Sequence, residues 1–520
     1  MKQSLHKTSG WKFAAAAALL LGLSGCTVGP KYHVASAPKP AAPNYKESPV
    51  NFQDADGWKV ASPQDAMLHG NWWEIFQEPE LNELERQLNI DNQNIKQYFE
   101  NYLVARAEIR EARSQYYPTV SVGPSFSRSR TSANVYQGTG TTSTTGTGGT
   151  TGTGGQAVQS NLITLPVDIS WAPDLFGRVR NTVREYQAGA QVSAADLENE
   201  RLLEQATLAQ TYFQIRGQDE LQVILDDTVK ADEDILKSTQ ALYDTGIDDQ
   251  VSVDQARQTF ESARAAATNN KVARAQYEHA IAMLLGKPAT DFTIPVRAMT
   301  KAPPAIPTGT PSQLLERRPD IAAAERTMAE ANAVIGIGYA AYYPTLTLTA
   351  GGGLESSAFS NLISWPSRFW SIGPSISETV FDAGLRRATI DQYVATYNAD
   401  VASYRQTVLT AFQQVEDYMA ETRILSTEIQ QAQRAQASAE SAFTLEKGRY
   451  ETGLDPYITL LSTQTALLTS RETVVNLQVE QMTSAVQLVE ALGGGWDTSQ
   501  LPTASQVTQK PPADERKIQQ

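Results

Sequence analysis

A hexapeptide recurs in this chain: YDTGID at residues 243–248 returns as YETGLD at residues 450–455. Gly177, in DLFGRVR, returns as Gly384, in FDAGLRR, and a Leu-Gly pair at 285–286 recurs in the same way. All three offsets are 207 residues, about the size of a domain, so the chain contains two copies of one unit. Each copy is predicted to run helix, strand pair, long helix, tight turn, long helix.

Alternating apolar and small polar residues predict the strand pairs. In the first copy they lie near 119–127 and 162–172, and in the second near 345–349 and 370–377. This alternation over about ten residues fits a tilted strand with one face in lipid. A half-buried strand of a soluble sandwich would show the same pattern. Proline lacks the N–H that a strand ladder needs, so bends or bulges are expected at three positions. These are Pro124, Pro166 and Pro374.

Long stretches without proline follow each strand pair, at about 178–242 and 385–449, and each leads through a turn into a return helix, at about 250–285 and 457–492. At ~1.5 Å per residue, each long stretch would reach about 100 Å. In the last helix, apolar residues recur every seven positions in two neighbouring columns, which predicts coiled-coil packing on both sides. The columns are Leu461, Leu468, Val475, Met482 and Val489, and Leu460, Leu467, Val474 and Leu488.

Four strands are too few to close a barrel, since single-chain barrels begin near eight. Open sheet edges in lipid would leave backbone groups without partners. Several chains are therefore expected to share one barrel. The predicted fold class is an α+β membrane protein with internal duplication.

The N-terminus predicts export and lipidation. Three lysines precede the apolar run FAAAAALLLGL at 13–23, which is too short to span a bilayer and fits the core of a signal peptide. The run ends in Leu-Ser-Gly-Cys, which resembles a bacterial lipobox. We expect cleavage before Cys26, followed by S-diacylglycerol and N-palmitoyl modification; a secretory signal with an incidental cysteine is the alternative. Thr27, in place of Asp, favours sorting to the outer membrane.

Neither the composition nor the motifs of the chain indicate an enzyme or a metal site. Cys26 is the only cysteine, so acylation leaves no thiol for a disulfide or a metal site. The histidines are isolated in sequence, and the chain lacks metalloprotease, nucleophile-elbow and nucleotide-binding motifs. We expect no enzymatic activity, no metal and no cofactor besides the covalent lipid. The formal charge of −14 argues against nucleic acid as a partner.

The chain divides by these signals into five parts. A Gly/Thr-rich tract at 138–155 lengthens only the first copy and is expected to be a flexible inserted loop. The parts are a lipoprotein signal peptide (1–25), a lipid-anchored extended tether (26–75), the first repeat (76–302), the second repeat (303–495) and a flexible C-terminal tail (496–520).

Three motifs together resemble the TolC-like outer-membrane efflux factors. They are LLERRPDIAAAERTMAEANAVIGIGYAAYYPTLTLTAGGG (314–353), WAPDLFGRVR (171–180) and the lipobox followed by TVGP. The similarity is greatest to the lipidated NodT-like subgroup, which works with resistance-nodulation-division pumps. It covers about 79–495 plus the lipid signal.

This resemblance implies a homotrimer in the bacterial outer membrane, with four strands per chain in a shared 12-strand β-barrel and an α-barrel of long helices in the periplasm. It also implies a periplasmic adaptor protein and an inner-membrane efflux pump as partners. The implied function is a passive exit duct for drugs or other toxic small molecules. A lipid-anchored periplasmic coiled-coil scaffold without a pore is the alternative.

The resemblance also places a gate at the two tight turns. Asp455 precedes Pro456 and could cap the helix that follows, and Asp248 and Asp249 could do the same for theirs. Capping the helices and lining a constriction are compatible roles. The candidate constriction residues are Tyr243, Asp248, Asp249, Asp254, Arg449, Tyr450 and Asp455.

Overall fold

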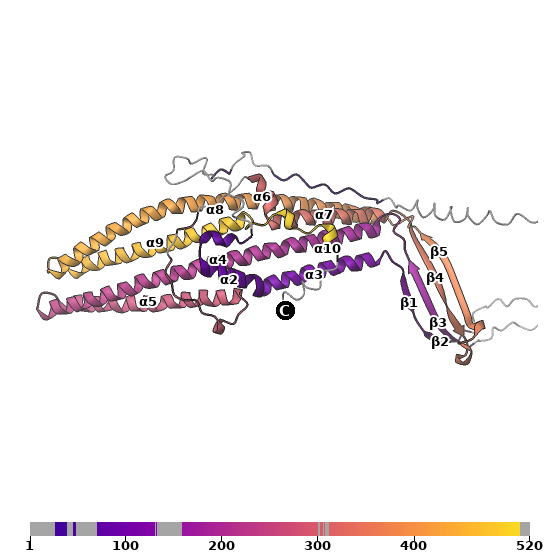
Figure 1. Cartoon of the computed structure of the whole chain (residues 1–520), viewed down its shortest axis with the longest axis horizontal. Helices are drawn as coiled ribbons and strands as arrows, with labels where there is room; N and C mark the ends of the chain where they lie inside the picture. The colour runs from indigo at the N-terminus through magenta and orange to yellow at the C-terminus, as the bar shows by residue number, and fades with distance from the viewer. Residues whose placement is uncertain are drawn as a thin grey trace, which may run out of the picture. The chain divides into compact units, whose positions relative to one another are not determined.

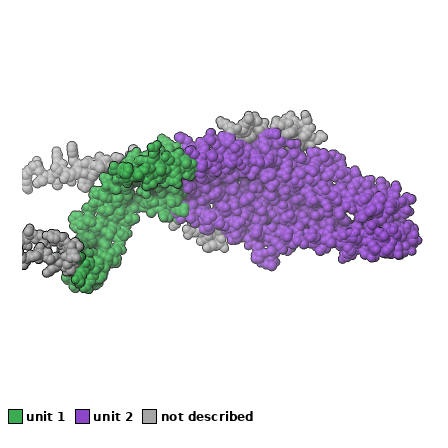
Figure 2. Space-filling model, turned by 180° about the vertical axis from the view of Figure 1, so that it is seen from behind, with its two compact units in different colours: residues 1–32, 108–186, 331–396 green, residues 33–107, 187–330, 397–520 purple. Residues whose placement is uncertain are grey.

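A computed structural model describes residues 27–38, 45–47, 70–130, 132, 159–299, 302–304, 306 and 311–509. The signal peptide, Cys26, the Gly/Thr-rich tract and the end of the C-terminal tail lie outside the described residues. The chain forms two compact units, and each takes segments from both repeats (Figure 2). Unit 1 comprises 1–32, 108–186 and 331–396, and unit 2 comprises 33–107, 187–330 and 397–520.

The duplication governs the secondary structure. Helix α4 (Arg178–Asp244) and its return helix α5 (Gln250–Leu284) in the first repeat match α8 (Leu385–Glu451) and α9 (Tyr457–Ala491) in the second. Every bound differs by the predicted 207 residues. Figure 1 shows α4 with α5, and α8 with α9, as two long helical hairpins. Each repeat begins with shorter helices, which are α2 (Pro79–Asp91) and α3 (Gln93–Ser114), then α6 (Pro311–Arg317) and α7 (Pro319–Ala340).

The strands form one antiparallel sheet in unit 1 (Figure 1). The predicted first strand is present as two pieces, β1 (Thr119–Val122) and β2 (Ser125–Arg130), which both pair with β3 (Gln159–Trp171). β3 pairs next with β4 (Thr345–Ser356), and β4 with β5 (Arg368–Ser377). The sheet therefore has four strand positions, and β1/β2 and β5 lie at its edges.

The prolines lie where the ladder is interrupted or at an edge. Pro124 falls between β1 and β2, as predicted. The register passes from Val122 opposite Val167 to Ser125 opposite Thr164, so Pro166 faces this gap and pairs only on its other side, with Gly353. A Cβ on Gly353 would clash with the carbonyl oxygen of Leu165, so the close approach requires glycine. Pro374 is in the edge strand β5.

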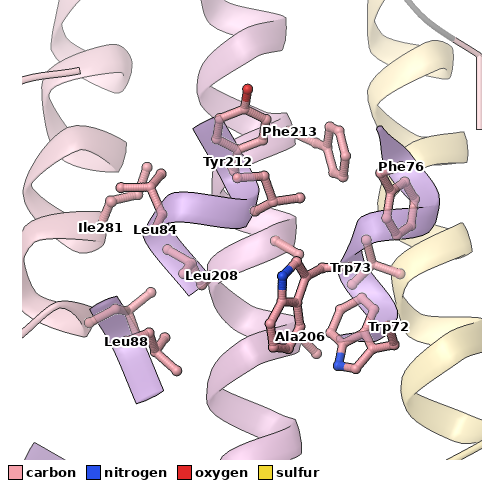
Figure 3. Close-up of a cluster of buried hydrophobic side chains, with 14 of the residues drawn as sticks. Trp72, Trp73, Phe76, Leu84, Leu88, Ala206, Leu208, Tyr212, Phe213 and Ile281 are labelled. Carbon is pink, nitrogen blue, oxygen red and sulfur yellow. The ribbon is translucent and has the colours of Figure 1, made fainter. Parts of the chain in front are cut away.

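The main core of unit 2 joins short helices to long ones. Trp72, Trp73 and Phe76 come from a 3₁₀ helix, η3 (Trp72–Phe76), and pack with leucines of α2 against α4, as Figure 3 shows. Ile281 of α5 and Met482 of α9 belong to the same cluster. In α9 the predicted apolar columns are buried from Leu460 to Val489, apart from half-buried Leu461 and Leu468.

Unit 2 also contains a network of buried, paired charged groups centred on Asp219. The Asp219 carboxylate is fully buried and accepts from Arg216 at 3.0 Å, from Arg274 at 2.7 Å and from the backbone N–H of Arg297 at 2.9 Å. The two guanidinium groups also donate to the carbonyl oxygens of Pro295 and Ile294. The network thereby attaches the segment after α5 to the hairpin it leaves.

Three sequence expectations need correction. The prediction of an extended tether over 26–75 is wrong at its C-terminal end, because η3 places Trp72 and Trp73 in the core. The tail is not free after 496: Trp496 is buried, and α10 (Ala504–Thr508) lies beside α4, with Gln187 donating to Thr508. The first helix is broken at Asn92, whose side-chain oxygen accepts from the N–H of Ile95.

Described parts of the tether are bound to helices. In unit 1, the N–H of Val28 donates to the carbonyl of Phe176, and Asn181 donates back to the carbonyl of Val28 at 3.1 Å. A Cβ on Gly177 would lie 3.0 Å from Thr27 Cα. In unit 2, Glu416 accepts from two backbone N–H groups, those of residues 46 and 47. We call residues 27–30 the strap.

The repeats supply a matched test of the strap. Gly177 and Gly384 have φ values of +81° and +90°, but only a Cβ at Gly177 would meet Thr27, whereas at Gly384 it would meet open space. Both alanine variants carry the same left-handed strain, ~1 kcal/mol. Gly177→Ala should release the strap and speed tryptic cleavage after the exposed Lys31; Gly384→Ala should not. Equal cleavage rates in the two variants would contradict this docking.

Candidate functional site

The two hairpin tips share one backbone design. Gly246 follows α4 and Gly453 follows α8, with φ of +74° and +72°. Their N–H groups donate to the carbonyls of Tyr243 and Tyr450, at 2.9 and 2.8 Å. Glycine in the left-handed conformation after a helix end satisfies last-turn carbonyls. The repeated Thr-Gly pair therefore produces the same turn twice.

Tyr450 joins the two tips. Its side chain is buried, and its hydroxyl lies 2.7 Å from Thr239 Oγ1 on α4 and 3.0 Å from the carboxylate Oδ2 of Asp248 in the first turn. Burial raises the pKa of the Tyr450 phenol well above its ordinary value, and the Asp248 carboxylate adds to the effect. The hydroxyl is therefore a neutral donor that binds a carboxylate of the other hairpin.

Apolar contacts surround this polar link. The Tyr457 ring of α9 meets the Tyr450 ring edge-on, with centroids 5.8 Å apart. Both tyrosines pack with Leu460 of α9 and with Ile235 and Ala256 of the first hairpin. The tips are thus held by a small aromatic and aliphatic cluster with one hydrogen-bonded link at its edge.

Asp455 has a different partner from the expected one. Helix α9 begins at Tyr457 with Pro456 as its N-cap, and no side chain caps it, so the expected cap by Asp455 is wrong. Its carboxylate instead accepts from the Arg449 guanidinium on both oxygens. This hydrogen-bonded pair lowers the pKa of Asp455. The reason is geometric: the turn brings Asp455 back over the last turn of α8, within reach of Arg449.

The other acidic residues at the tips have different roles. Asp249 caps α5, with its Oδ1 accepting from the N–H of Ser252 at 2.9 Å, as expected. Asp248 caps nothing and binds Tyr450. Asp254 is largely exposed and accepts from Gln250 at 3.1 Å, within its own helix. Tyr243, the counterpart of Tyr450, is 39% exposed, against 2% for Tyr450. The tip contact within a chain is therefore one-sided.

A second link between the hairpins was not expected from the sequence. Asp232 of α4 is buried and accepts from Nε2 of Gln464 in α9, and the Oε1 of Gln464 has no hydrogen-bond partner among the described residues. Burial raises the pKa of Asp232 to about 6. A protonated carboxyl can donate to that oxygen and form a two-point acid–amide pair. Helical periodicity could have flagged Asp232 as an acid on a buried face.

The Asp232 pair gives a pH-dependent prediction. Since its pKa in the folded protein lies above the ordinary value, ionisation opposes folding, and stability falls as pH rises from about 4 through about 6. Asp232→Asn keeps both hydrogen bonds without the charge, so it should stabilise the fold at pH 8 by up to about 3 kcal/mol per chain, measured as a higher Tm, and change little below about pH 4. The exposed Asp227→Asn is the control. Thermal unfolding in detergent measures both; no gain at pH 8 would refute a buried charge.

Two general findings bear on the chemistry of the site. Over the described residues, none of the helices has both the length and the apolar character to cross a bilayer. The same residues hold no group of three or more His, Cys, Asp or Glu side chains placed to bind a metal ion.

Comparison with known proteins gives consistent matches over most of the chain. The family model described as outer membrane efflux protein matches residues 86–287 and 310–494. The probable efflux pump outer membrane protein TtgC of Pseudomonas putida is 30% identical over 476 residues, covering 91% of this chain and 93% of TtgC. Among solved structures, the outer-membrane channel OprN is 27% identical with a TM-score of 0.77, covering 91% of this chain and 100% of that one.

A more distant structure has the same fold. The CmeC outer membrane channel of Campylobacter jejuni is 22% identical and has a TM-score of 0.79, with 92% of this chain and 97% of that chain covered. The likeness to CmeC is one of fold.

Proposed function

The chain belongs to the outer membrane efflux protein family, and we propose that three copies of it form the exit duct of a tripartite efflux assembly. The protein is an outer-membrane efflux channel whose helical part lies in the periplasm. In the proposed assembly a periplasmic adaptor protein and an inner-membrane pump deliver small molecules to it. The duct is passive, so the choice of transported compound belongs to the pump.

The sheet edges support the trimer. Within the described residues, β1/β2 pair only with β3, and β5 pairs only with β4, so one side of each is without a strand partner. Unpaired backbone groups in hydrocarbon cost several kcal/mol each. Joining β5 of one chain to β1/β2 of the next removes these edges. Three chains give a closed antiparallel barrel within the range of strand numbers known for outer-membrane barrels.

The Tyr450–Asp248 contact is the observation that carries the proposed gate. It is a buried hydrogen bond between the two hairpins of one chain, at the point where both turn back. In a ring of six hairpins, such contacts would hold adjacent tips together and narrow the periplasmic mouth. The Arg449–Asp455 pair stays within one tip and shapes that turn.

If this contact closes the gate, removing the hydroxyl oxygen of Tyr450 should change the conductance. Tyr450→Phe keeps the packed ring but removes the hydroxyl, at ~1 kcal/mol per chain or roughly 3 kcal/mol for three chains opening together. The closed–open balance should shift by about 100-fold, and open probability in planar bilayers should rise. The matched control is Tyr243→Phe, which alters the exposed tyrosine of the other tip and should conduct like wild type.

Stability and assembly must be measured in parallel. If Tyr450→Phe forms intact trimers with wild-type melting and wild-type conductance, closure does not depend on this contact. The constriction would then lie elsewhere, for which Asp254 and the exposed face of α5 are the next candidates.

We also propose that Cys26 carries the membrane anchor. Cys26 lies outside the described residues, but the strap begins at Thr27 and is docked in unit 1. The docking of Thr27 and Val28 beside Phe176 and Gly177, where a strand gives way to a helix, supports an anchor at this level. Acyl chains attached there could enter the adjoining leaflet.

The anchor is tested by labelling. Cys26→Ser removes the only thiol, so incorporation of radiolabelled palmitate should be lost completely. The barrel strands provide a second hold on the membrane, so the variant should remain in the membrane fraction but assemble less efficiently. Palmitate incorporation that persists in Cys26→Ser would rule out this lipid site.

A further inference from the structure

An unneutralised group of arginines lies on the apolar face of the sheet, at the end away from the helices. In the register of the sheet, Arg128 pairs with Asn161, Arg130 with Gln159 and Arg368 with Leu354. All three lie on the face that carries Phe126, Ile163 and Trp370, because paired residues share a face and alternate residues along a strand do too. We call them the rim arginines.

The rim lies at the height expected for the edge of a membrane. Trp171 ends β3 on the same face, and Asn161, opposite Arg128, is ten residues earlier in the strand. At ~3.3 Å per residue and a tilt of ~40°, ten residues rise about 25 Å, which is about the height of the apolar band of an outer-membrane sheet. Arg128 and Arg130 therefore mark the far boundary of that band.

Nothing acidic on the described part of this face balances them. The rim arginines are exposed, and none forms an ion pair among the described residues. Glu355 pairs with Thr164 and so points to the opposite face. In sequence, the connecting segments 131–158 and 356–367 contain no acidic residue. The guanidinium of Arg368 is stacked 3.5 Å from the ring centroid of Trp365, which orients it.

Chain pairing decides how close the arginines come. Within one chain, β2 and β5 are three strand spacings apart, or ~14 Å. In the proposed trimer, which this inference assumes, β5 of one chain adjoins β1/β2 of the next, and the strands that carry the arginines are then one spacing apart, ~5 Å. Arg368 of one chain and Arg128 and Arg130 of its neighbour then lie on adjacent strands of one seam.

We propose that each of the three seams binds the phosphate group of a lipid headgroup in the outer leaflet. Guanidinium groups bind phosphate through paired N–H donors, and the apolar residues beneath them accommodate the acyl chains of the same lipid. The lipid thereby bridges adjacent chains where the strands end. A lipid headgroup, rather than free phosphate, is the ligand because the apolar face continues directly below the rim.

The test compares two triple variants that remove the same charge. R128Q/R130Q/R368Q clears the rim, whereas R113Q/R178Q/R387Q removes three exposed arginines from the helical end of unit 1. Trimers in phosphatidylcholine nanodiscs are supplied with fluorescent lipopolysaccharide, and bound lipid per trimer is counted. The rim variant should retain at most about one-tenth of the lipid that wild type retains. The control variant should retain as much lipid as wild type.

Three further arms make the result decisive. R128K/R130K/R368K keeps the charge and should retain most of the lipid, which separates loss of binding from misfolding. Dephosphorylated lipopolysaccharide should bind wild type as weakly as the rim variant binds the phosphorylated form. A large excess of inorganic phosphate should leave the lipid bound; its complete displacement would show a site for free phosphate and overturn the proposal.

Trimer cross-linking and single-channel conductance of the same samples separate this inference from the proposed function. Conducting trimers whose rim variant binds lipid like wild type would overturn the lipid site alone. A wild-type protein that forms no conducting trimer would overturn the proposed function instead.

Discussion

The free edges of the sheet are the constraint from which the rest of the architecture follows. One chain supplies four strand positions and leaves two rows of backbone donors and acceptors unpaired, which hydrocarbon does not tolerate. The chain cannot remove these edges alone, so assembly is required for membrane insertion rather than added to it. In the proposed trimer the long hairpins also acquire neighbours from the adjacent chains.

Much of the fold could be predicted because its signals are local. The long helices follow from uninterrupted patterning without proline, and their ends follow from the repeated Thr-Gly turn. The break between β1 and β2 follows from Pro124. Contacts between distant segments could not be predicted: Asn92 ends a helix while donating to the carbonyl of Leu284, 192 residues away. Trp72 and Trp73 resembled part of a tether because their core is supplied by α4 and α9.

The candidate site also divides into features that the sequence could predict and features that it could not. Its residues could be chosen from the repeated hexapeptide, but their environments could not, because closely similar local sequence gives Tyr450 a buried position and leaves Tyr243 exposed. An equivalent pair of arginines shows a similar divergence. Arg216 ties down the segment that leaves the first repeat, whereas Arg423, 207 positions later, binds Glu47 of the tether at 2.7 Å. Each copy has kept the arginine and changed its partner.

The strap has a consequence for the symmetry of the assembly. Duplication gives each chain two equivalent glycine positions at the start of its long helices, so the proposed ring of three chains presents six. One N-terminus per chain can occupy only one of each pair, and it occupies the position at Gly177. The ring therefore alternates between filled and open positions, and its order is reduced from sixfold to threefold. In such a ring, any partner that binds at this level would meet two kinds of surface in turn, which favours a stoichiometry of three or of three pairs.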